Sequence, residues 1–352
     1  MRKINQQLIA EKLQISRATV SRCFTNHPGI NPATRAKVFA LASRMGYSHQ
    51  EKRDTPAKRR QVQRLAFGVL ICVDLPNFDH TGYANPGQEL LNGLSEIARV
   101  QDVRLDLHFV RPEDLHLDSP SYAKILAPRQ RRWDGVVLIY PFPISIVDEL
   151  AAKYPVVSLV EQYGSKPLNC IDVDHHRGID QLVRLLHGLG HRRIGFFSWR
   201  YPVAASWALR RYGAYVESLT SLGVSPLPAD AINVDPRQQL TVESAHARAL
   251  ERTRDGVTAW ICAADHQAYD LIDYFKQQGL SVPKDISVTG FDGFDAPSGR
   301  VQLTTMQIPY HQIGVTGGKR LLELIGKPFE PTQHTLLNCE PRSGATVAVP
   351  SP

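Results

Sequence analysis

Residues 16–22 read Ser-Arg-Ala-Thr-Val-Ser-Arg, a heptad between an apolar segment and a polar turn. Residues four apart lie one above the other on the same side of a helix. If a helix begins after Ser16, position 17 therefore lies beside 21 and position 18 beside 22, and the two pairs form one face. That face presents two arginines and two small side chains, whereas Val20 and Phe24 point the other way. Arginine donates a bidentate pair of hydrogen bonds to guanine in the major groove, and small side chains let the backbone approach the base edges. The heptad therefore predicts a helix that reads double-stranded DNA.

The segments on both sides predict two more short helices. Asn5 is a good N-cap for a first helix, and Ser16 for the second. Asn31-Pro32 gives a cap followed by proline at the first helical position, and Gly46 suits a left-handed helix end. Three short helices around one core, with polar residues exposed on the second, predict an all-α helix-turn-helix domain. The alternative is a generic three-helix module that binds no DNA.

Charge is distributed unevenly along the chain. Residues 1–64 contain 14 Lys+Arg and 3 Asp+Glu, whereas the other 288 residues contain 27 and 31, and the whole chain carries a formal +7. The basic character therefore belongs to the N-terminal segment. Counterion release by such a segment favours phosphate-backbone binding with a steep salt dependence.

The remaining composition favours a cytoplasmic protein. No apolar run approaches the roughly 20 residues of a membrane helix, and we see no signal peptide. The five cysteines are scattered without a Cys-x-x-Cys pair, so they predict reduced thiols and neither disulfides nor a metal site. We expect no cofactor.

Residues 48–64 have the composition of a linker. They are basic and almost free of apolar side chains, and Pro56 would stop or kink a helix there. The segment either lies along the DNA backbone or minor groove, or serves as a plain tether.

From Leu65 onward, apolar strand-like runs alternate with amphipathic segments, and the cycle restarts after about residue 164. Two successive series of βα units predict two doubly wound parallel sheets with helices on both faces, an α/β fold. Ligands of such sheets bind beyond the carboxyl ends of the strands, so two facing lobes would hold a ligand in a cleft between them. The expected strands are 65–73, 104–110, 134–140, 156–160, 193–197, 231–234, 259–263 and 286–291, and the expected helices are 87–99, 144–153, 179–189, 204–222, 239–252 and 269–278.

Five ordered motifs give the chain a specific resemblance. It resembles the LacI/GalR family of transcriptional regulators over nearly its full length. The resemblance implies a periplasmic-binding-protein-like core, a homodimer, and palindromic operator DNA bound with an affinity that a small molecule of carbohydrate type modulates. The motifs are Ala18-Thr19-Val20-Ser21-Arg22 with Asn26, Val173-Asp174-x-x-x-Gly178, Gly190-His191-Arg192-Arg193-Ile194, Pro283-x-x-Ile286-Ser287-Val288-x-Gly290-Phe291-Asp292, and Leu303-Thr304-Thr305.

The resemblance divides the chain into a DNA-binding domain at 1–47, a basic linker or hinge at 48–64, and an effector-binding core at 65–347. One lobe of the core takes about 65–163 and 294–322, and the other takes about 164–293 and 323–347. We expect DNA contacts from Asn5, Ser16, Arg17, Ala18, Thr19, Ser21, Arg22, Asn26, Arg35 and Tyr47.

The family's effector arginine precedes x-x-Gly and falls on Arg210, and its effector aspartate falls on Asp292. A carboxylate can bind adjacent sugar hydroxyls, and a guanidinium can bind hydroxyl or carboxylate oxygens. The alternative is an ion pair between the lobes with no ligand. Tyr140 and Trp199 are candidates for apolar pocket walls or for core residues, and Asp265 is a further candidate for the effector site.

Several positions depart from the family pattern. Tyr47 is followed by Ser-His-Gln where the family has x-Pro-Asn, and no leucine occurs between Met45 and Leu65 to act as a hinge wedge. We hypothesise that linker Arg or Lys contact the minor groove instead. Ala264 stands where many relatives carry a ligand-binding asparagine, and residues 77–83 are longer and more polar than the usual loop.

Functions of other classes have weaker support. An enzyme is not expected, because the dinucleotide, Walker, His-Glu-x-x-His and Gly-x-Ser-x-Gly motifs are absent. A stand-alone solute-binding protein would not carry the basic three-helix segment. If the protein is a transcriptional regulator, we favour a repressor, and an activator is the alternative.

Overall fold

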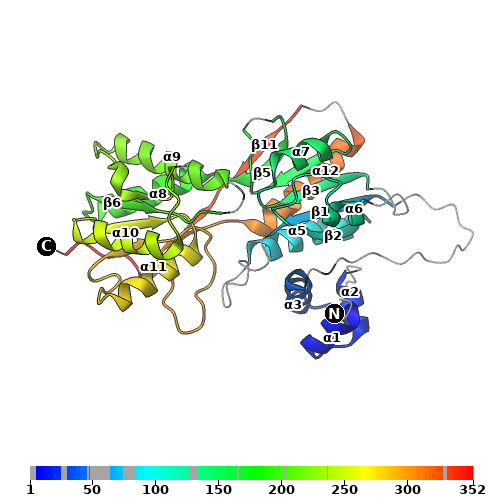
Figure 1. Cartoon of the computed structure of the whole chain (residues 1–352), viewed down its shortest axis with the longest axis horizontal. Helices are drawn as coiled ribbons and strands as arrows, with labels where there is room; N and C mark the ends of the chain where they lie inside the picture. The colour runs from blue at the N-terminus through cyan, green and yellow to red at the C-terminus, as the bar shows by residue number, and fades with distance from the viewer. Residues whose placement is uncertain are drawn as a thin grey trace, which may run out of the picture. The chain divides into compact units, whose positions relative to one another are not determined.

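The structure of the chain is a computed structural model that describes residues 5–24, 30–45, 47, 64–73, 85–126, 133–164, 166–201, 203, 205–235, 237–327 and 331–351. The chain divides into two compact units, here called unit 1 and unit 2. Among the described residues, unit 1 takes those within 5–73, 85–172 and 310–335, and unit 2 takes those within 173–309 and 336–351. Figure 1 shows the labelled elements of both units.

Unit 1 opens with three short helices, α1 (Gln6–Leu13), α2 (Arg17–Phe24) and α3 (Pro32–Arg44). The Asn5 side chain accepts a hydrogen bond from the Leu8 amide at 2.9 Å, and the Ser16 hydroxyl accepts one from the Thr19 amide at 3.0 Å. Both predicted caps therefore satisfy amides that the first helical turn leaves without a partner.

The core of these helices is small and partly aromatic. Ile9 and Val20 are fully buried, and the Phe24 ring lies 5.4 Å from the rings of both Phe39 and Tyr47, centroid to centroid. One apolar side of each helix thus closes the core, and the predicted helix-turn-helix fold is confirmed.

The rest of unit 1 is built on a six-stranded sheet with the order β11-β5-β4-β3-β1-β2. β1, β3, β4 and β5 are buried along their whole length, as expected for parallel strands covered on both faces. The strands are β1 (Ala66–Cys72), β2 (Arg104–Val110), β3 (Gly135–Ile139), β4 (Val156–Leu159), β5 (Asn169–Val173) and β11 (His334–Leu337), and the helices are α5 (Pro86–Val100), α6 (Pro120–Ile125), α7 (Ile144–Ala151) and α12 (Tyr310–Gly326).

Helices α5 and α12 touch through their backbones. A Cβ atom at Gly93 would lie 2.0 Å from the carbonyl oxygen of His311, and one at Gly314 would lie 2.2 Å from the carbonyl oxygen of Leu90. Any side chain at either glycine would push the two helices apart, so glycine is required there by close approach.

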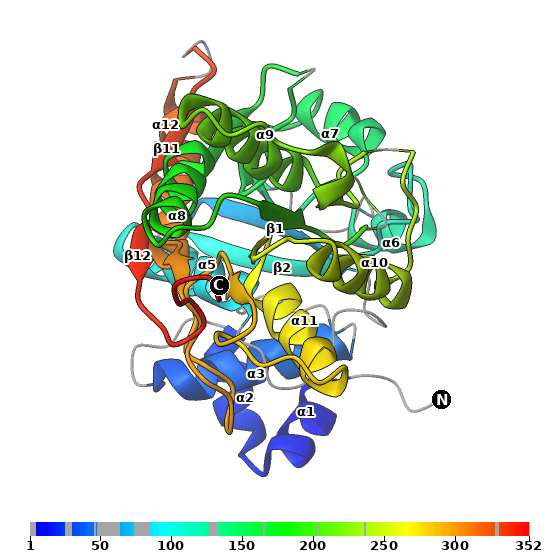
Figure 2. The same ribbon diagram turned by 90° about the vertical axis from the view of Figure 1, so that its left-hand side faces the viewer.

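Unit 2 is built on a four-stranded sheet with the order β7-β6-β8-β9, and all its strand pairs are parallel. Figure 1 shows α8 and α9 on one side of this sheet and α10 and α11 on the other, so the sheet is doubly wound. In Figure 2, α8 and α9 again lie side by side. The strands are β6 (Ile194–Phe197), β7 (Ala231–Ile232), β8 (Ala259–Cys262) and β9 (Ser287–Thr289), and the helices are α8 (His175–Gly188), α9 (Ser206–Ser221), α10 (Val242–Arg254) and α11 (Asp265–Gln277).

The Gly190-His191 motif fastens the C-terminal segment to unit 2. His191 is 1% exposed, and its ring nitrogens lie 2.9 Å from the hydroxyl of Thr258 and 2.9 Å from the carbonyl oxygen of Ala348. The amide of Val288 in β9 donates to the carbonyl of Thr346, so this segment covers the edge of β9. The motif therefore has a structural role here.

The His246 imidazole makes unit 2 sensitive to acid. It stacks on Phe197 and Tyr274, with ring centroids 5.5 and 5.2 Å away, and its buried Nε2 has no hydrogen-bond partner among the described residues. Burial lowers its pKa, more than nearby carboxylates raise it. The unfolded chain therefore takes up this proton first, and we expect the melting temperature to fall as the pH drops below about 6.5, the ordinary pKa of histidine.

A His246→Phe variant provides the control for this prediction. It keeps the aromatic stack and removes the titrating group, so its melting temperature should fall less between pH 7.5 and 5.5. Asp265 has the opposite effect on the melting temperature. Burial and the Asp292 charge raise its pKa to about 7, so the folded protein binds this proton more readily than the unfolded chain does. The difference between wild type and variant isolates the histidine, and equal acid dependence in both would refute the prediction.

The division of the core differs from the expected one. Residues 164–172 were expected in the second lobe, but β5 pairs with β4 and belongs to the sheet of unit 1. Residues 294–309 were expected in the first lobe, but β10 (Thr305–Gln307) pairs with β12 (Glu340–Arg342) in unit 2. Within the described residues, the chain passes between the units at 172/173, 309/310 and 335/336, later in each case than the expected limits at 163/164, 293/294 and 322/323.

Several elements begin or end away from their expected limits. Helix α8 starts four residues earlier than expected, because the Asp174 side chain caps it by accepting from the amide of Arg177. Helix α11 starts at Asp265, also four residues early, and β7 ends two residues early at Ile232. No described helix is long and apolar enough to cross a bilayer.

Candidate nucleic-acid interface and ligand site

Helix α2 exposes the side that the sequence predicts. Arg17, Ala18 and Arg22 are exposed, Thr19 and Ser21 are partly so, and Val20, Cys23 and Phe24 are buried. Amphipathic packing thus fixes the direction of the exposed side, which carries two guanidiniums beside small residues. Such a surface fits the major groove, where arginine can reach guanine and the helix backbone can come close to the bases.

The other expected DNA contacts lie in different surroundings. Asn5 uses its side-chain oxygen as a cap, and Ser16 pairs with Thr19 through their hydroxyls at 2.9 Å. Tyr47 packs on Phe24 in the small core, and burial raises its pKa. Arg35 is half-buried, and burial lowers its pKa. Asn26, the linker at 48–63 and the loop at 77–83 lie outside the described residues.

In unit 2, the residues expected at the ligand site gather near the carboxyl ends of the strands. Asp292 follows β9 and is 7% exposed, and its carboxylate accepts the amide of Asp265 at 3.1 Å, at the start of α11. Ala264 is the N-cap of α11 and offers no side-chain acceptor. Asp292 therefore supplies an acceptor to a helix start that has no capping side chain.

Both carboxylate oxygens of Asp265 accept hydrogen bonds from other residues of unit 2. One carboxylate oxygen accepts from the Thr305 hydroxyl at 2.6 Å, and the other accepts from the amides of Gly293 and Phe294 at 2.8 and 3.2 Å. Burial and the neighbouring Asp292 raise its pKa to about 7. Its contacts make it an anchor of the loop after β9, and they do not direct it to a ligand.

Helix α9 carries two neighbouring arginines with different surroundings. Arg210 is half-buried, and Arg211 is 4% exposed. The Arg211 guanidinium lies 4.0 Å from the ring centroid of Phe291 and 4.7 Å from that of Trp207. The resemblance points to Arg210, whereas the more deeply buried guanidinium belongs to Arg211.

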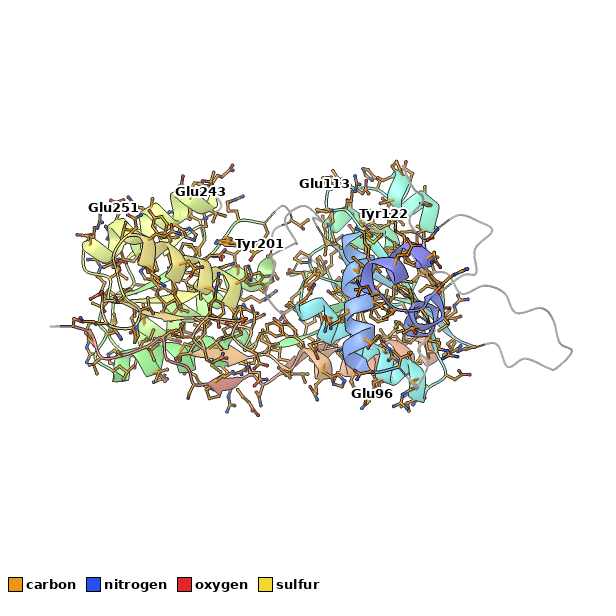
Figure 3. The ribbon with its side chains drawn as sticks, turned by 90° about the horizontal axis from the view of Figure 1, so that it is seen from below. Glu96, Glu113, Tyr122, Tyr201, Glu243 and Glu251 are labelled. Carbon is orange, nitrogen blue, oxygen red and sulfur yellow. The ribbon has the colours of Figure 1, made fainter. Side chains whose placement is uncertain are left out.

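Trp199 belongs to an aromatic cluster that the sequence did not predict. Its ring lies edge-on to His266 at 5.0 Å, and Tyr201 lies edge-on to Trp207 at 5.4 Å. Gln267 donates its amide to the Tyr201 hydroxyl at 2.7 Å. Figure 3 labels Tyr201 beside the helices of unit 2. These side chains come from the segments after β6 and β8, so their position directly after buried strands was the one available sequence signal.

Tyr140, at the end of β3 in unit 1, is hydrogen-bonded to the start of α5. Its hydroxyl donates to the Asn85 side chain at 2.9 Å and accepts from the amide of Gly87 at 2.7 Å, at the start of α5. Its φ of 72° is left-handed, as is the φ of 60° at Val160 directly after β4. Left-handed non-glycine residues cost energy and gather at functional sites, so this sheet edge is a candidate for one.

The described residues contain no group of three or more His, Cys, Asp or Glu side chains that could hold a metal ion. The five cysteines are free and buried, and burial raises the pKa of Cys23, Cys72, Cys262 and Cys339. All five are therefore core residues, and the four with raised pKa have little thiolate character.

Comparisons with known proteins agree with this arrangement. A family model described as a periplasmic binding protein-like domain matches residues 183–347. The chain is 28% identical to the HTH-type transcriptional regulator IpsA of Corynebacterium glutamicum, covering 97% of this chain and 96% of that protein. It is 27% identical to the HTH-type transcriptional repressor CytR of Escherichia coli, covering 94% and 93%.

Two solved structures share the fold across the chain. A lac repressor dimer bound to operator and the anti-inducer ONPF superposes with a TM-score of 0.65 at 21% identity, covering 99% of this chain and 100% of that one. The transcriptional regulator CelR in complex with cellobiose superposes with a TM-score of 0.65 at 19% identity, covering 98% and 100%.

Proposed function

We propose that the chain belongs to the LacI/GalR family of transcriptional regulators and that it is a repressor that binds palindromic operator DNA as a homodimer. Its affinity for the operator is modulated by a small carbohydrate. The protein acts in the cytoplasm and catalyses no reaction. Residues 1–47 serve as the DNA-binding domain, 48–64 as the hinge, and the two α/β units as the effector-binding core.

The exposed side of α2 is the observation that carries the DNA-binding part. Arg17, Ala18, Ser21 and Arg22 stand on a helix whose opposite side is locked into the core by Val20 and Phe24. In a homodimer, two such helices would enter successive major grooves and read a palindrome. The basic charge of residues 1–64 supports the phosphate contacts that this docking needs.

The carboxyl edge of the unit 2 sheet supports the ligand part. Asp292 and Arg210 provide a carboxylate and a guanidinium, and Trp199 provides an apolar ring. Relatives of this fold have been solved with cellobiose, glucose, sucrose or ribose, which makes a carbohydrate the first class to test. The repressor assignment draws support from relatives such as CytR, and a transcriptional activator is the second candidate.

A thermal-shift screen of the full chain tests the ligand site. Cellobiose, glucose, sucrose, ribose and their sugar acids are added singly to wild type and to Arg210→Ala. A sugar at 100 times its Kd stabilises the folded protein by about 2.7 kcal/mol, and we expect Arg210→Ala to lose most of that gain. DNA affinity should stay nearly unchanged in the absence of sugar, because Arg210 is proposed to contact the ligand and is not among the residues expected to contact DNA.

Arg248→Ala is the matched control, because Arg248 is an arginine of unit 2 whose side chain is 42% exposed. It should respond to the sugar as wild type does. A normal response of Arg210→Ala would show that the assignment of Arg210 is wrong. If no carbohydrate stabilises the wild type, the proposal that the ligand is a carbohydrate is wrong. The proposal of DNA binding is unaffected, because it rests on the exposed side of α2.

A further inference from the structure

The Arg211 guanidinium is buried in unit 2 and forms no ion pair with any described residue. Its Nε donates to Nδ1 of His175 at 3.1 Å, its Nη1 donates to the carbonyl of Ala263, and its plane faces the rings of Phe291 and Trp207. A buried charge is expensive, and an apolar side chain of similar volume often gives equal or greater stability. The contacts of Arg211 therefore require an explanation other than stability.

Two of these contacts involve residues near the boundaries between the units. We call the stretches of chain at the boundaries 172/173, 309/310 and 335/336 the crossing segments. His175 is the third residue after the crossing at 172/173. Phe291 precedes Asp292, whose amide donates to the carbonyl of Met306 and whose carbonyl accepts the amide of Ile308, both at 3.0 Å. Ile308 stands just before the crossing at 309/310. Arg211 thus contacts one crossing segment directly, through His175, and is linked to a second through Phe291 and the backbone of Asp292.

The third crossing segment is joined to the same group. The amide of Asp174 donates to the carbonyl of Leu337 at 2.8 Å, directly after the crossing at 335/336. A Cβ atom at Gly178 would lie 2.6 Å from both Sγ of Cys339 and a ring carbon of Phe291. The packing between α8, β9 and this segment therefore leaves no free space at Gly178. A displacement of one segment is passed to the others, because close-packed side chains transmit strain.

Helix α9 connects this group to the ligand site. Arg210 and Arg211 are adjacent on it, and the ring of Trp207, one turn earlier, contacts both Tyr201 and Arg211. A ligand that shifts the start of α9 would move the Arg211 guanidinium relative to His175 and Phe291. The five donors of a guanidinium have a fixed planar geometry, so such a shift either breaks these contacts or carries the crossing segments with it.

We propose that Arg211 is a positioning residue that couples helix α9 to the three crossing segments and thereby sets the DNA affinity of the ligand-free protein. The inference rests on the proposed function, because it assumes that the core controls DNA binding. It differs from a local role, in which Arg211 only holds α9 on the sheet. A local role predicts a loss of stability with no change in the affinity of the folded protein for DNA.

The test uses the full chain and a DNA duplex that the wild-type protein selects from a random pool. The Kd for this duplex is measured at one salt concentration, well below the melting temperature of each variant. Arg211→Met removes the donors and the charge, and we expect its Kd to rise at least about fivefold, the lower end of ordinary allosteric couplings. Arg211→Lys keeps the charge without the planar geometry and should fall between Arg211→Met and wild type.

Arg252→Met is the matched control. Arg252 is a largely buried arginine of unit 2 that donates to Asp230 at 2.8 Å, near the amino ends of the strands and away from the crossing segments. It should lower the melting temperature and leave the Kd unchanged. His175→Phe keeps an aromatic ring and removes the acceptor of the Arg211 Nε, so it should raise the Kd as Arg211→Met does, and it serves if Arg211→Met does not fold.

The outcomes separate the two proposals. If Arg211→Met and His175→Phe bind the duplex as wild type does, Arg211 has a local role and the inference is overturned. If Arg252→Met weakens DNA binding as much as they do, the effect follows general destabilisation and the inference is again overturned. If the wild type selects no duplex, the proposed DNA-binding function fails, and the inference falls with it.

Discussion

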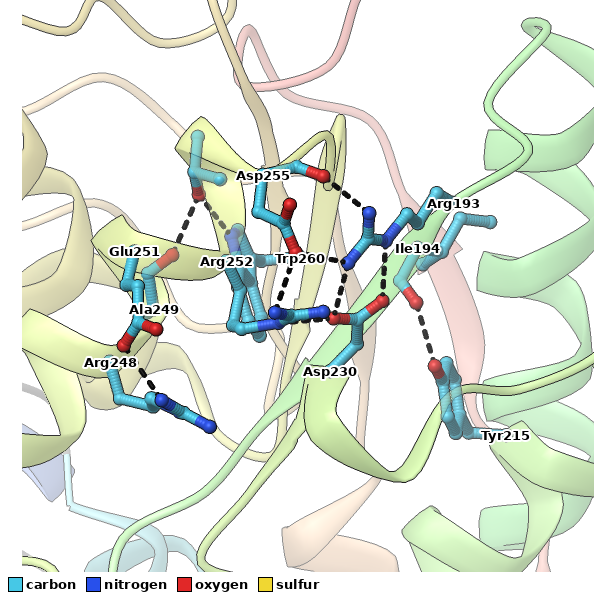
Figure 4. A network of polar contacts seen from close by, with 11 residues as sticks. Arg193, Ile194, Tyr215, Asp230, Arg248, Ala249, Glu251, Arg252, Asp255 and Trp260 are labelled. Atoms are coloured by element: carbon cyan, nitrogen blue, oxygen red, sulfur yellow. Dashed lines mark hydrogen bonds and ion pairs between the residues drawn. The ribbon is translucent and has the colours of Figure 1, made fainter.

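Replacing Asp230 with alanine is expected to lower the free energy of unfolding of unit 2 by about 3 kcal/mol, the lower end of the effect of removing one partner from a buried ion pair. Asp230 is 1% exposed and lies between two arginines. Its carboxylate accepts from Arg193 Nε at 2.7 Å and Nη2 at 3.1 Å, and from Arg252 Nε at 2.8 Å. Figure 4 shows this network at close range.

The large effect comes from the charges that the substitution would leave behind. The Arg193 and Arg252 side chains are 28% and 14% exposed, so neither can be fully hydrated when Asp230 is lost. Asp255 also pairs with both, but its side chain is 58% exposed and water screens its charge. The partial exposure of the arginines is the reason to expect the lower end of the range.

Urea unfolding of the full chain measures the effect. Tryptophan fluorescence reports mainly on unit 2, because Trp199, Trp207 and Trp260 lie there and only Trp133 lies in unit 1. Asp235→Ala is the control, since Asp235 pairs with an arginine whose side chain is 90% exposed. Surface pairs of that kind contribute at most about 1 kcal/mol. Equal losses in the two variants would contradict the special role of Asp230.

The parts of the fold that the sequence predicts are those with local signals. Caps at Asn5 and Ser16, and buried strands such as Gly135–Ile139, depend on neighbours a few residues away. Helix α12 was missed because Gly314, Gly317 and Gly318 weaken a helical pattern, although close packing against α5 and β4 requires small residues there.

The position of β5 illustrates a non-local decision. Its residues, Asn169–Val173, form a short run that follows an irregular segment, and the sequence alone does not assign it to either sheet. The amide of Cys170 in β5 donates to the carbonyl of Gln333, and the amide of Asp174, just after β5, donates to the carbonyl of Leu337, each more than 160 residues later. Pairing over that distance leaves no periodic pattern in the sequence. The expected boundary between the lobes therefore falls before β5, whereas the structure has it at the end of β5.

The proposed ligand site lies on the segments that the sequence indicates, but some of its expected side chains have other contacts. Asp292 and Trp199 lie at the expected edge of the unit 2 sheet, whereas Asp265 and Tyr140 are engaged in loop and helix anchoring. Arg210 and Arg211 differ by one position, which turns a side chain by about 100° around a helix. Only the packing of α9 decides which of the two is buried.

Arg22→Ala should give the largest change in DNA recognition. Arg22 is exposed on α2 and stands four residues after Ala18, so its guanidinium can reach a base edge while the small neighbour lets the helix approach. Loss of a bidentate arginine–guanine pair costs about 1–3 kcal/mol, or roughly 5–150-fold in Kd for the selected duplex. The folded domain should persist, because Val20 and Phe24 form its core and Arg22 does not.

A comparison of two duplexes separates base reading from charge. Binding of wild type and variants is measured on the selected duplex and on a scrambled one at the same salt concentration. Lys12→Ala is the control, because Lys12 is an exposed cation in the last turn of α1 and should affect both duplexes alike. Arg22→Ala should lose affinity for the selected duplex only. If it weakens both duplexes equally, Arg22 contacts phosphate, and sequence is read by other residues of α2, with Arg17 the first to test.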